Sequence, residues 1–191
     1  MTAELARHNM LTQQIRAWNI LDEELLKLLA ALPREDFVPA LYRDLAFADI
    51  QLPLGYGESM LTPKEEARLL DALKVQRTER VLEIGTGSGY FTALLARQAK
   101  HVESVDIHAE FIEAASHKLA EAQCHNVLLA TADAASGYKK STHFDVIVIT
   151  GSLPVLPKSF MQQLTLGGRL LAFLGKTPSV EAVLLTRSGE K

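Results

Sequence analysis

The sequence has one cysteine, no long apolar run and no metal-ligand cluster, and each shortage excludes a class of protein. A single cysteine, Cys124, among 191 residues excludes an internal disulfide and favours a reducing compartment, so we expect a cytoplasmic protein. The longest apolar runs are far too short to span a membrane, and the first residues lack the apolar block of a signal peptide. No group of cysteines and histidines has the spacing of metal ligands. We therefore expect neither a membrane partner nor a metal site.

Basic clusters are also missing. The net charge is −3, aromatic residues make up 6% of the chain, and no run of Lys and Arg is interleaved with aromatics. This composition gives no support for a nucleic-acid partner. Hydrophobic residues make up 48% and charged residues 23%, which is ordinary for a globular protein of one domain with a sizeable core. We expect Cys124, near the start of a predicted strand, to serve packing and not as a nucleophile.

The most informative segment is 81–90, VLEIGTGSGY. A β-prone apolar run carries the acid Glu83, passes through Gly85, Gly87 and Gly89, and leads into residues with helical spacing. This order predicts a strand, a tight turn and a helix, which open an α/β nucleotide-binding unit. Glycines suit such a turn because a Cβ would keep the backbone from approaching a flat ligand closely.

The spacing of the glycines indicates which nucleotide is bound. A dinucleotide fingerprint would place its third glycine at position 90, which is Tyr90, whereas here it falls at Gly89. Glu83 would repel a pyrophosphate but attract a cationic amino-acid group. Asp106 ends the next predicted strand, where an acid can accept hydrogen bonds from both ribose hydroxyls. An adenosyl ligand with a positively charged amino acid is S-adenosyl-L-methionine, which we predict as the cofactor.

The pattern along the chain predicts an α/β fold with a doubly wound, mostly parallel sheet. The first 61 residues read as an N-terminal helical segment that ends in a substrate-side loop over 46–62, and Trp18 is expected in the core. Thr62, Pro63 and Glu65 form a predicted capping box that starts a helix and the Rossmann-like domain, 62–191. Strands are predicted at 80–84, 101–106, 126–131, 144–150, 168–174 and 180–187, with helices between the first five.

The carboxyl ends of the first four strands should form one crevice, because ligands of such sheets bind there. We expect Asp133 to accept a hydrogen bond from an adenine amino group, between apolar walls from Ile107 and Ala132. The alternative is an ordinary surface aspartate. The predicted cofactor-binding residues are Glu83, Gly85, Thr86, Gly87, Ser88, Gly89, Tyr90, Asp106, Ile107, Ala132, Asp133 and Thr150.

Several segments, in the same order along the chain, resemble the protein-L-isoaspartate O-methyltransferase family. Segment 81–90 matches the family's glycine-rich motif almost letter for letter, and 33–39 (PREDFVP) resembles its P-R-E-x-F-V-P segment. The resemblance implies a class I S-adenosylmethionine-dependent methyltransferase of Rossmann-like fold, and an isoaspartyl-containing protein or peptide as its substrate in protein repair. The other matching segments are 9–15 (NMLTQQI), 52–57 (LPLGYG), 144–150 (FDVIVIT) and 166–170 (LGGRL).

The chain departs from the family pattern in the expected acceptor site. Family members read G-Q-T-I-S-x-P where this chain has 57–63, GESMLTP. Leu61 stands at the place of the serine that serves the substrate, and Glu58 replaces a neutral glutamine. The candidate catalytic residues are therefore Ser59, Leu61 and Thr62. We prefer Ser59 as the orienting donor, because Thr62 is expected to cap a helix, and we expect Glu58 to point to solvent.

Three functional hypotheses stay open at this point. The first is an isoaspartyl carboxyl methyltransferase, which the whole-length resemblance favours and which we prefer. The second is a methyltransferase of the same family that acts on another acceptor, such as a small molecule. The third is a cofactor-binding module without transferase activity. Leu61, together with Gly151 and Ser152 where the family has two alanines, favours the second or the third.

Overall fold

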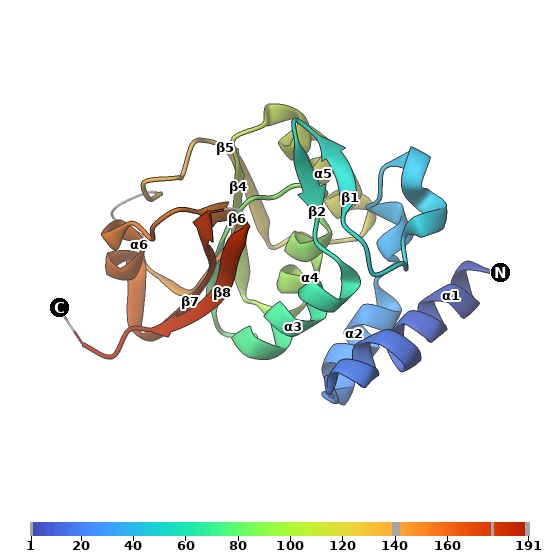
Figure 1. Cartoon of the computed structure of the whole chain (residues 1–191). Helices are drawn as coiled ribbons and strands as arrows, with labels where there is room; N and C mark the ends of the chain where they lie inside the picture. Colours follow the sequence, from blue (N-terminus) through green and yellow to red (C-terminus); the bar gives the residue numbers. More distant parts are fainter. Residues whose placement is uncertain (1, 139–141, 177, 190–191) are drawn as a thin grey trace.

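A six-stranded sheet with helices packed on it forms the centre of the protein (Figure 1). The computed structural model describes residues 2–138, 142–176 and 178–189. The strands, in the spatial order β5-β4-β3-β6-β7-β8, are Val127–Thr131, His101–Asp106, Arg80–Ile84, Phe144–Leu153, Leu164–Lys176 and Ser179–Thr186.

The order of the strands reverses between β3 and β6. From β3 the chain moves outward through β4 to β5, and then returns to place β6 on the other side of β3. All neighbouring strands are parallel except β7 and β8, which are antiparallel. The prediction of a doubly wound, mostly parallel sheet is confirmed. In such a sheet a ligand site is expected at the carboxyl ends of β3 and β6, between which the strand order reverses.

The helices α3 Pro63–Leu73, α4 Tyr90–Gln98, α5 Ala109–Glu121 and α6 Lys158–Gln163 accompany the sheet. The capping box of α3 is confirmed, since the Thr62 hydroxyl accepts from the Glu65 N–H and the Glu65 carboxylate accepts from the Thr62 N–H. The prediction of a helix between β5 and β6 is wrong for the described residues 132–138 and 142–143. Asp133 there accepts from the N–H of Ala135, which favours a turn over a helix.

The N-terminal segment is helical, as predicted, up to position 45. Helix α2 starts after Asp22, whose carboxylate accepts from two backbone N–H groups, and it buries Leu25, Leu26 and Leu29. The expectation for Trp18 is wrong: this side chain is 50% exposed, and Lys64 Nζ lies 4.5 Å from its ring centroid. The remaining helices are α1 Ala3–Asn9, the π-helix η1 Met10–Ile15, and the 3₁₀-helices η2 Arg16–Trp18, η3 Arg34–Asp36 and η4 Ala40–Leu45.

Part of the predicted substrate-side loop is a β-hairpin. Strand β1, Leu52–Gly55, pairs antiparallel with β2, Glu58–Met60, so the expectation of a segment without strands is wrong here. Gly55, Tyr56 and Gly57 all have positive φ, which lets the chain reverse within two residues. The tip of the hairpin contacts α5, since the Tyr56 ring packs edge-on against Phe111.

Apolar side chains cover both faces of the sheet, because successive strand residues point to opposite faces. Val81 belongs to the larger cluster, which includes residues of α2, α3, α4 and α5, and its neighbour Leu82 belongs to a second cluster with Phe160 of α6. Cys124 is buried and free, in agreement with a packing role. No helix in the described part of the chain is long and apolar enough to cross a membrane.

Candidate functional site

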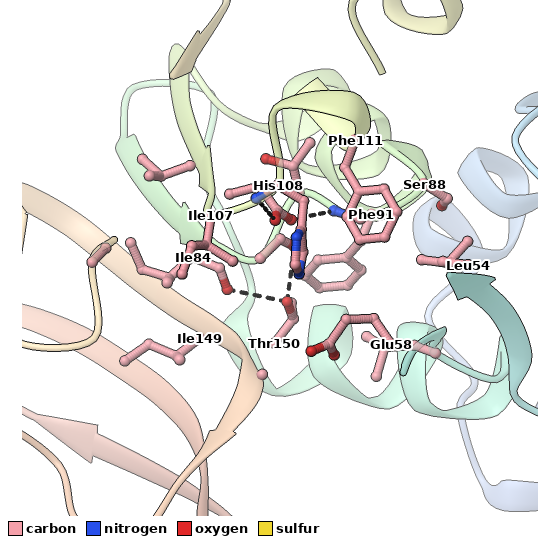
Figure 2. A pocket seen from close by; sticks show the side chains of 18 of the residues that line it. Leu54, Glu58, Ile84, Ser88, Phe91, Ile107, His108, Phe111, Ile149 and Thr150 are labelled. Carbon is pink, nitrogen blue, oxygen red and sulfur yellow. Dashed lines mark hydrogen bonds between the residues drawn. The ribbon is translucent and has the colours of Figure 1, made fainter. Parts of the chain in front are cut away.

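A cavity of about 400 Å³ lies at the carboxyl ends of β3, β4 and β6, where the strand order reverses (Figure 2). Loops that follow these strands form one side of the cavity, and the β1–β2 hairpin forms the other. The structure brings most of the predicted site residues together here. Those that line the cavity are Ser59, Leu61, Gly85, Thr86, Gly87, Ser88, Asp106, Ile107, Ala132, Asp133 and Thr150.

Asp106 is the best-placed carboxylate of the cavity. One of its oxygens accepts from the Gly87 N–H at 2.9 Å and the other accepts from the His108 N–H at 3.0 Å. Each carboxylate oxygen can accept a further hydrogen bond, so two adjacent hydroxyl donors can still be bound. Asp106 therefore both fixes the glycine-rich turn and offers the acceptors that a ribose requires.

Gly85 is required by the close approach of Thr150 from β6. The Thr150 hydroxyl lies 2.8 Å from the carbonyl oxygen of Gly85 and 3.1 Å from that of Ile84 (Figure 2). A Cβ on Gly85 would lie 2.3 Å from this hydroxyl, and the φ of +103° already disfavours any side chain. The contact joins β3 to β6 at the floor of the site.

Glu83 does not line the cavity, and this corrects the expectation that its carboxylate faces a cationic ligand group. The side chain is completely buried, and its Oε2 accepts from the hydroxyls of Thr92 and Ser104 at 2.5 and 2.6 Å. Its Oε1 has no hydrogen-bond partner within the described part of the chain. Burial raises the pKa of Glu83 to about 7, against the effect of the two hydroxyls, and the charge of Asp106 adds to the increase.

Gly89 and Tyr90 also lie outside the cavity lining. A Cβ on Gly89 would approach the Cβ of Ala115 in α5 to 2.9 Å, so this glycine serves helix packing. Tyr90 is buried, with its ring centroid 5.4 Å from that of Phe37. The sequence motif therefore combines ligand-facing residues with residues that only hold the turn against the core.

Ser59 and Leu61 line the cavity on the side of the hairpin, whereas Thr62 does not line the cavity. The hydroxyl of Thr62 is engaged in the cap of α3. The expectation that Glu58 points to solvent holds only in part. Its side chain is exposed, yet it lines the cavity and points into it (Figure 2).

Two groups of site residues were missed in the sequence. The ring of Tyr56, at the tip of the hairpin, stacks on His108 at 4.3 Å, and Phe111 packs edge-on against both rings. Glu66 lines the cavity from α3 and forms a buried ion pair with Arg34 at 2.9 Å. The sequence spacing of His108 and Phe111, about one helical turn, indicates that these two rings are neighbours. Nothing in the sequence relates Tyr56 to these rings or Arg34 to Glu66.

Burial raises the pKa of Glu66 to about 7, and the positive charge of Arg34 opposes this increase. Arg34 further donates to the carbonyl oxygens of Ala46 and Leu61 at 2.5 and 2.6 Å. This arginine therefore fixes the backbone at Leu61 from behind the cavity.

Comparisons with known proteins agree over nearly the whole chain. The family described as protein-L-isoaspartate(D-aspartate) O-methyltransferase matches residues 6–191. A protein-L-isoaspartate O-methyltransferase of Koribacter versatilis is 36% identical over 183 residues, which cover 96% of this chain and 82% of the relative.

Two solved structures share the fold. A protein-L-isoaspartate O-methyltransferase superposes with a TM-score of 0.79 at 24% identity, and the match covers 95% of this chain but 60% of that protein's length. A putative protein-L-isoaspartate O-methyltransferase from Plasmodium falciparum, solved in complex with S-adenosyl-L-homocysteine, gives a TM-score of 0.82 at 15% identity. That match covers 95% of this chain and 90% of the other.

Proposed function

The chain belongs to the protein-L-isoaspartate(D-aspartate) O-methyltransferase family, and from this premise we propose that it methylates the free α-carboxylate of L-isoaspartyl residues in damaged proteins and peptides, with S-adenosyl-L-methionine as methyl donor. The observation that carries the proposal is the family match over residues 6–191, since it includes the hairpin side of the cavity as well as the cofactor side.

The residues of the cavity fit the proposed cofactor. Asp106 offers two oxygens with free acceptor positions for the ribose, and Ile107 and Ala132 offer apolar surface beside Asp133 for the adenine. No Lys or Arg of the described chain lines the cavity, and a net positive ligand is therefore favoured over a phosphate. When bound, S-adenosyl-L-methionine supplies an electrophilic methyl group on a positively charged sulfur.

The acceptor chemistry needs positioning and little acid–base help. The free α-carboxylate of an isoaspartyl residue is ionised at neutral pH, so no residue has to remove its proton. The chain has to hold the carboxylate in line with the methyl group and exclude water from the two opposite charges. Ser59 is the hydroxyl of the hairpin available as an orienting donor, because Thr62 caps α3 and Leu61 is apolar.

We assign the two sides of the site to the two parts of the chain. Residues 1–61 would supply the acceptor side through the hairpin, and residues 62–191 would supply the cofactor side as the Rossmann-like unit. We also propose a cytoplasmic location, which the single, buried and free Cys124 supports because such a thiol suits a reducing compartment.

A second candidate function is methyl transfer to another acceptor, a small molecule or a different protein side chain. Two observations favour it: Leu61 stands where the family has a serine, and the charged Glu58 points into the cavity.

The two candidates predict different chemical linkages. Wild-type protein is incubated with methyl-labelled S-adenosyl-L-methionine and aged protein, and the labelled product is treated with mild base. A carboxyl ester releases the label as volatile methanol. Label that stays on the protein through base treatment indicates a nitrogen or hydroxyl acceptor and refutes the first candidate.

A further inference from the structure

Four acidic side chains line the cavity within the described residues. They comprise Glu58 from the hairpin, Glu66 from α3, Asp106 after β4 and Asp133 after β5, and within the described residues no Lys or Arg accompanies them. An acidic cavity suits a cofactor with a net positive charge. It is a poor environment for the second ligand, because the carboxylate to be methylated is itself an anion.

Three of the four acids are already engaged. Glu66 is paired with Arg34, the carboxylate of Asp106 accepts from two backbone N–H groups, and that of Asp133 accepts from the N–H of Ala135. The Glu58 carboxylate has no hydrogen bond or ion pair with any residue in 2–138, 142–176 or 178–189. It points from β2 into the cavity, on the hairpin side and next in sequence to Ser59 (Figure 2).

We propose that Glu58 selects isoaspartyl substrates that carry a lysine or arginine next to the isoaspartyl residue. This inference rests on the proposed function and names the substrate class within it. The cationic side chain of the substrate would pair with Glu58 and offset the repulsion between Glu58 and the acceptor carboxylate. Among the residues that the structure describes, no Lys or Arg lines the cavity to do this.

The adjacency of Glu58 and Ser59 in the hairpin indicates that the basic residue of the substrate lies next to the isoaspartyl residue. Glu58 and Ser59 are consecutive in β2, with Cα atoms about 3.8 Å apart, and both line the cavity although their side chains leave opposite faces of the strand. If Ser59 orients the acceptor carboxylate, a neighbouring residue of the substrate lies within reach of Glu58. Lys and Arg have long flexible stems, which suits contact with a carboxylate that is exposed at the edge of the cavity.

The test uses one isoaspartyl peptide in three forms, with Lys, Ala or Glu directly after the isoaspartyl residue. We expect the wild-type protein to show a kcat/KM about three- to tenfold higher for the Lys peptide than for the Ala peptide, and lower still for the Glu peptide, because the charges meet at a partly exposed site. Addition of 0.5 M salt (roughly a 4 Å screening length) should reduce the differences in kcat/KM among the three peptides.

Two variants make the test specific. Glu58→Gln should give similar kcat/KM values for the three peptides. It should not change the affinity for the cofactor, which calorimetry measures. Glu121→Gln removes one negative charge from the exposed end of α5, outside the cavity lining, and should leave the series as in wild type.

An unchanged series in Glu58→Gln, or an equal change in both variants, would overturn the inference. Weaker cofactor binding in Glu58→Gln with the peptide series intact would also overturn it, and would assign Glu58 to the cofactor. Methylation of none of the peptides by a protein that binds cofactor normally would refute the proposed function and this inference with it.

Discussion

Replacement of Glu83 by glutamine should change how the stability of the protein depends on pH. Burial raises the pKa of Glu83 from its ordinary 4.5 to about 7, so the folded protein binds this proton more tightly than the unfolded chain does. The stability that this proton confers is fully present below pH 4.5, and it is lost as the pH rises to about 7. Glutamine stays neutral throughout and avoids this loss.

The expected size follows from the same two values. A difference between 4.5 and about 7, at 1.36 kcal/mol per pH unit, corresponds to about 3 kcal/mol. Glutamine can still accept from the hydroxyls of Thr92 and Ser104, so these two bonds need not be lost. For a chain of this length the gain at pH 8 is worth roughly 6–12 °C in Tm.

The assay is thermal unfolding of wild type and Glu83→Gln between pH 5 and pH 8, without cofactor. The difference in Tm between the two proteins should grow in favour of the variant as the pH rises. Glu113→Gln, on the exposed surface of α5, is the matched control and should follow wild type. A difference in Tm that is the same at pH 5 and pH 8 would show that Glu83 does not hold a proton in the folded state.

Three further substitutions have defined outcomes. Asp106→Ala should weaken cofactor binding by about 1–3 kcal/mol, since it removes the charged acceptor and releases the Gly87 N–H; an unchanged Kd in calorimetry would exclude Asp106 from the cofactor site. Leu61→Ser should raise the rate on isoaspartyl peptides roughly tenfold to hundredfold at unchanged cofactor affinity, because a hydroxyl can donate to the carboxylate. No gain would mean that another donor of the hairpin already acts. Gly85→Ala should destabilise the protein by roughly 1–3 kcal/mol in denaturant unfolding, since its Cβ would meet the Thr150 hydroxyl at 2.3 Å. Thr150→Ala combined with it should recover part of the loss, and a loss that persists in full would assign the strain to the backbone alone.

The central sheet could be predicted from the sequence because its strands carry near-continuous apolar runs between turn residues. Strands β3 and β4 have the predicted bounds, and β5 differs from the prediction by one residue at its start. The capping box at Thr62 was also predictable, since it depends on residues three positions apart. In both cases the residues that determine the element lie close together in the sequence.

The hairpin and the buried acids depend on contacts that no local pattern contains. Leu52–Gly55 reads as a loop because of Pro53 and Gly55, and it becomes a strand only because it pairs with Glu58–Met60. Glu83 reads as a ligand-facing acid, although hydroxyls from α4 and β4 hold it below the turn. The cofactor side of the cavity was therefore predicted more completely than the acceptor side, because the latter depends on how the hairpin folds over the sheet.

Isoaspartyl methylation is measured by methyl transfer from labelled S-adenosyl-L-methionine to an isoaspartyl peptide beside its normal aspartyl twin, with the wild-type protein. We expect labelling of the isoaspartyl peptide that saturates with peptide concentration, and only background labelling of the twin. Equal labelling of both peptides, or labelling of neither by protein that binds the cofactor, would contradict the proposed function.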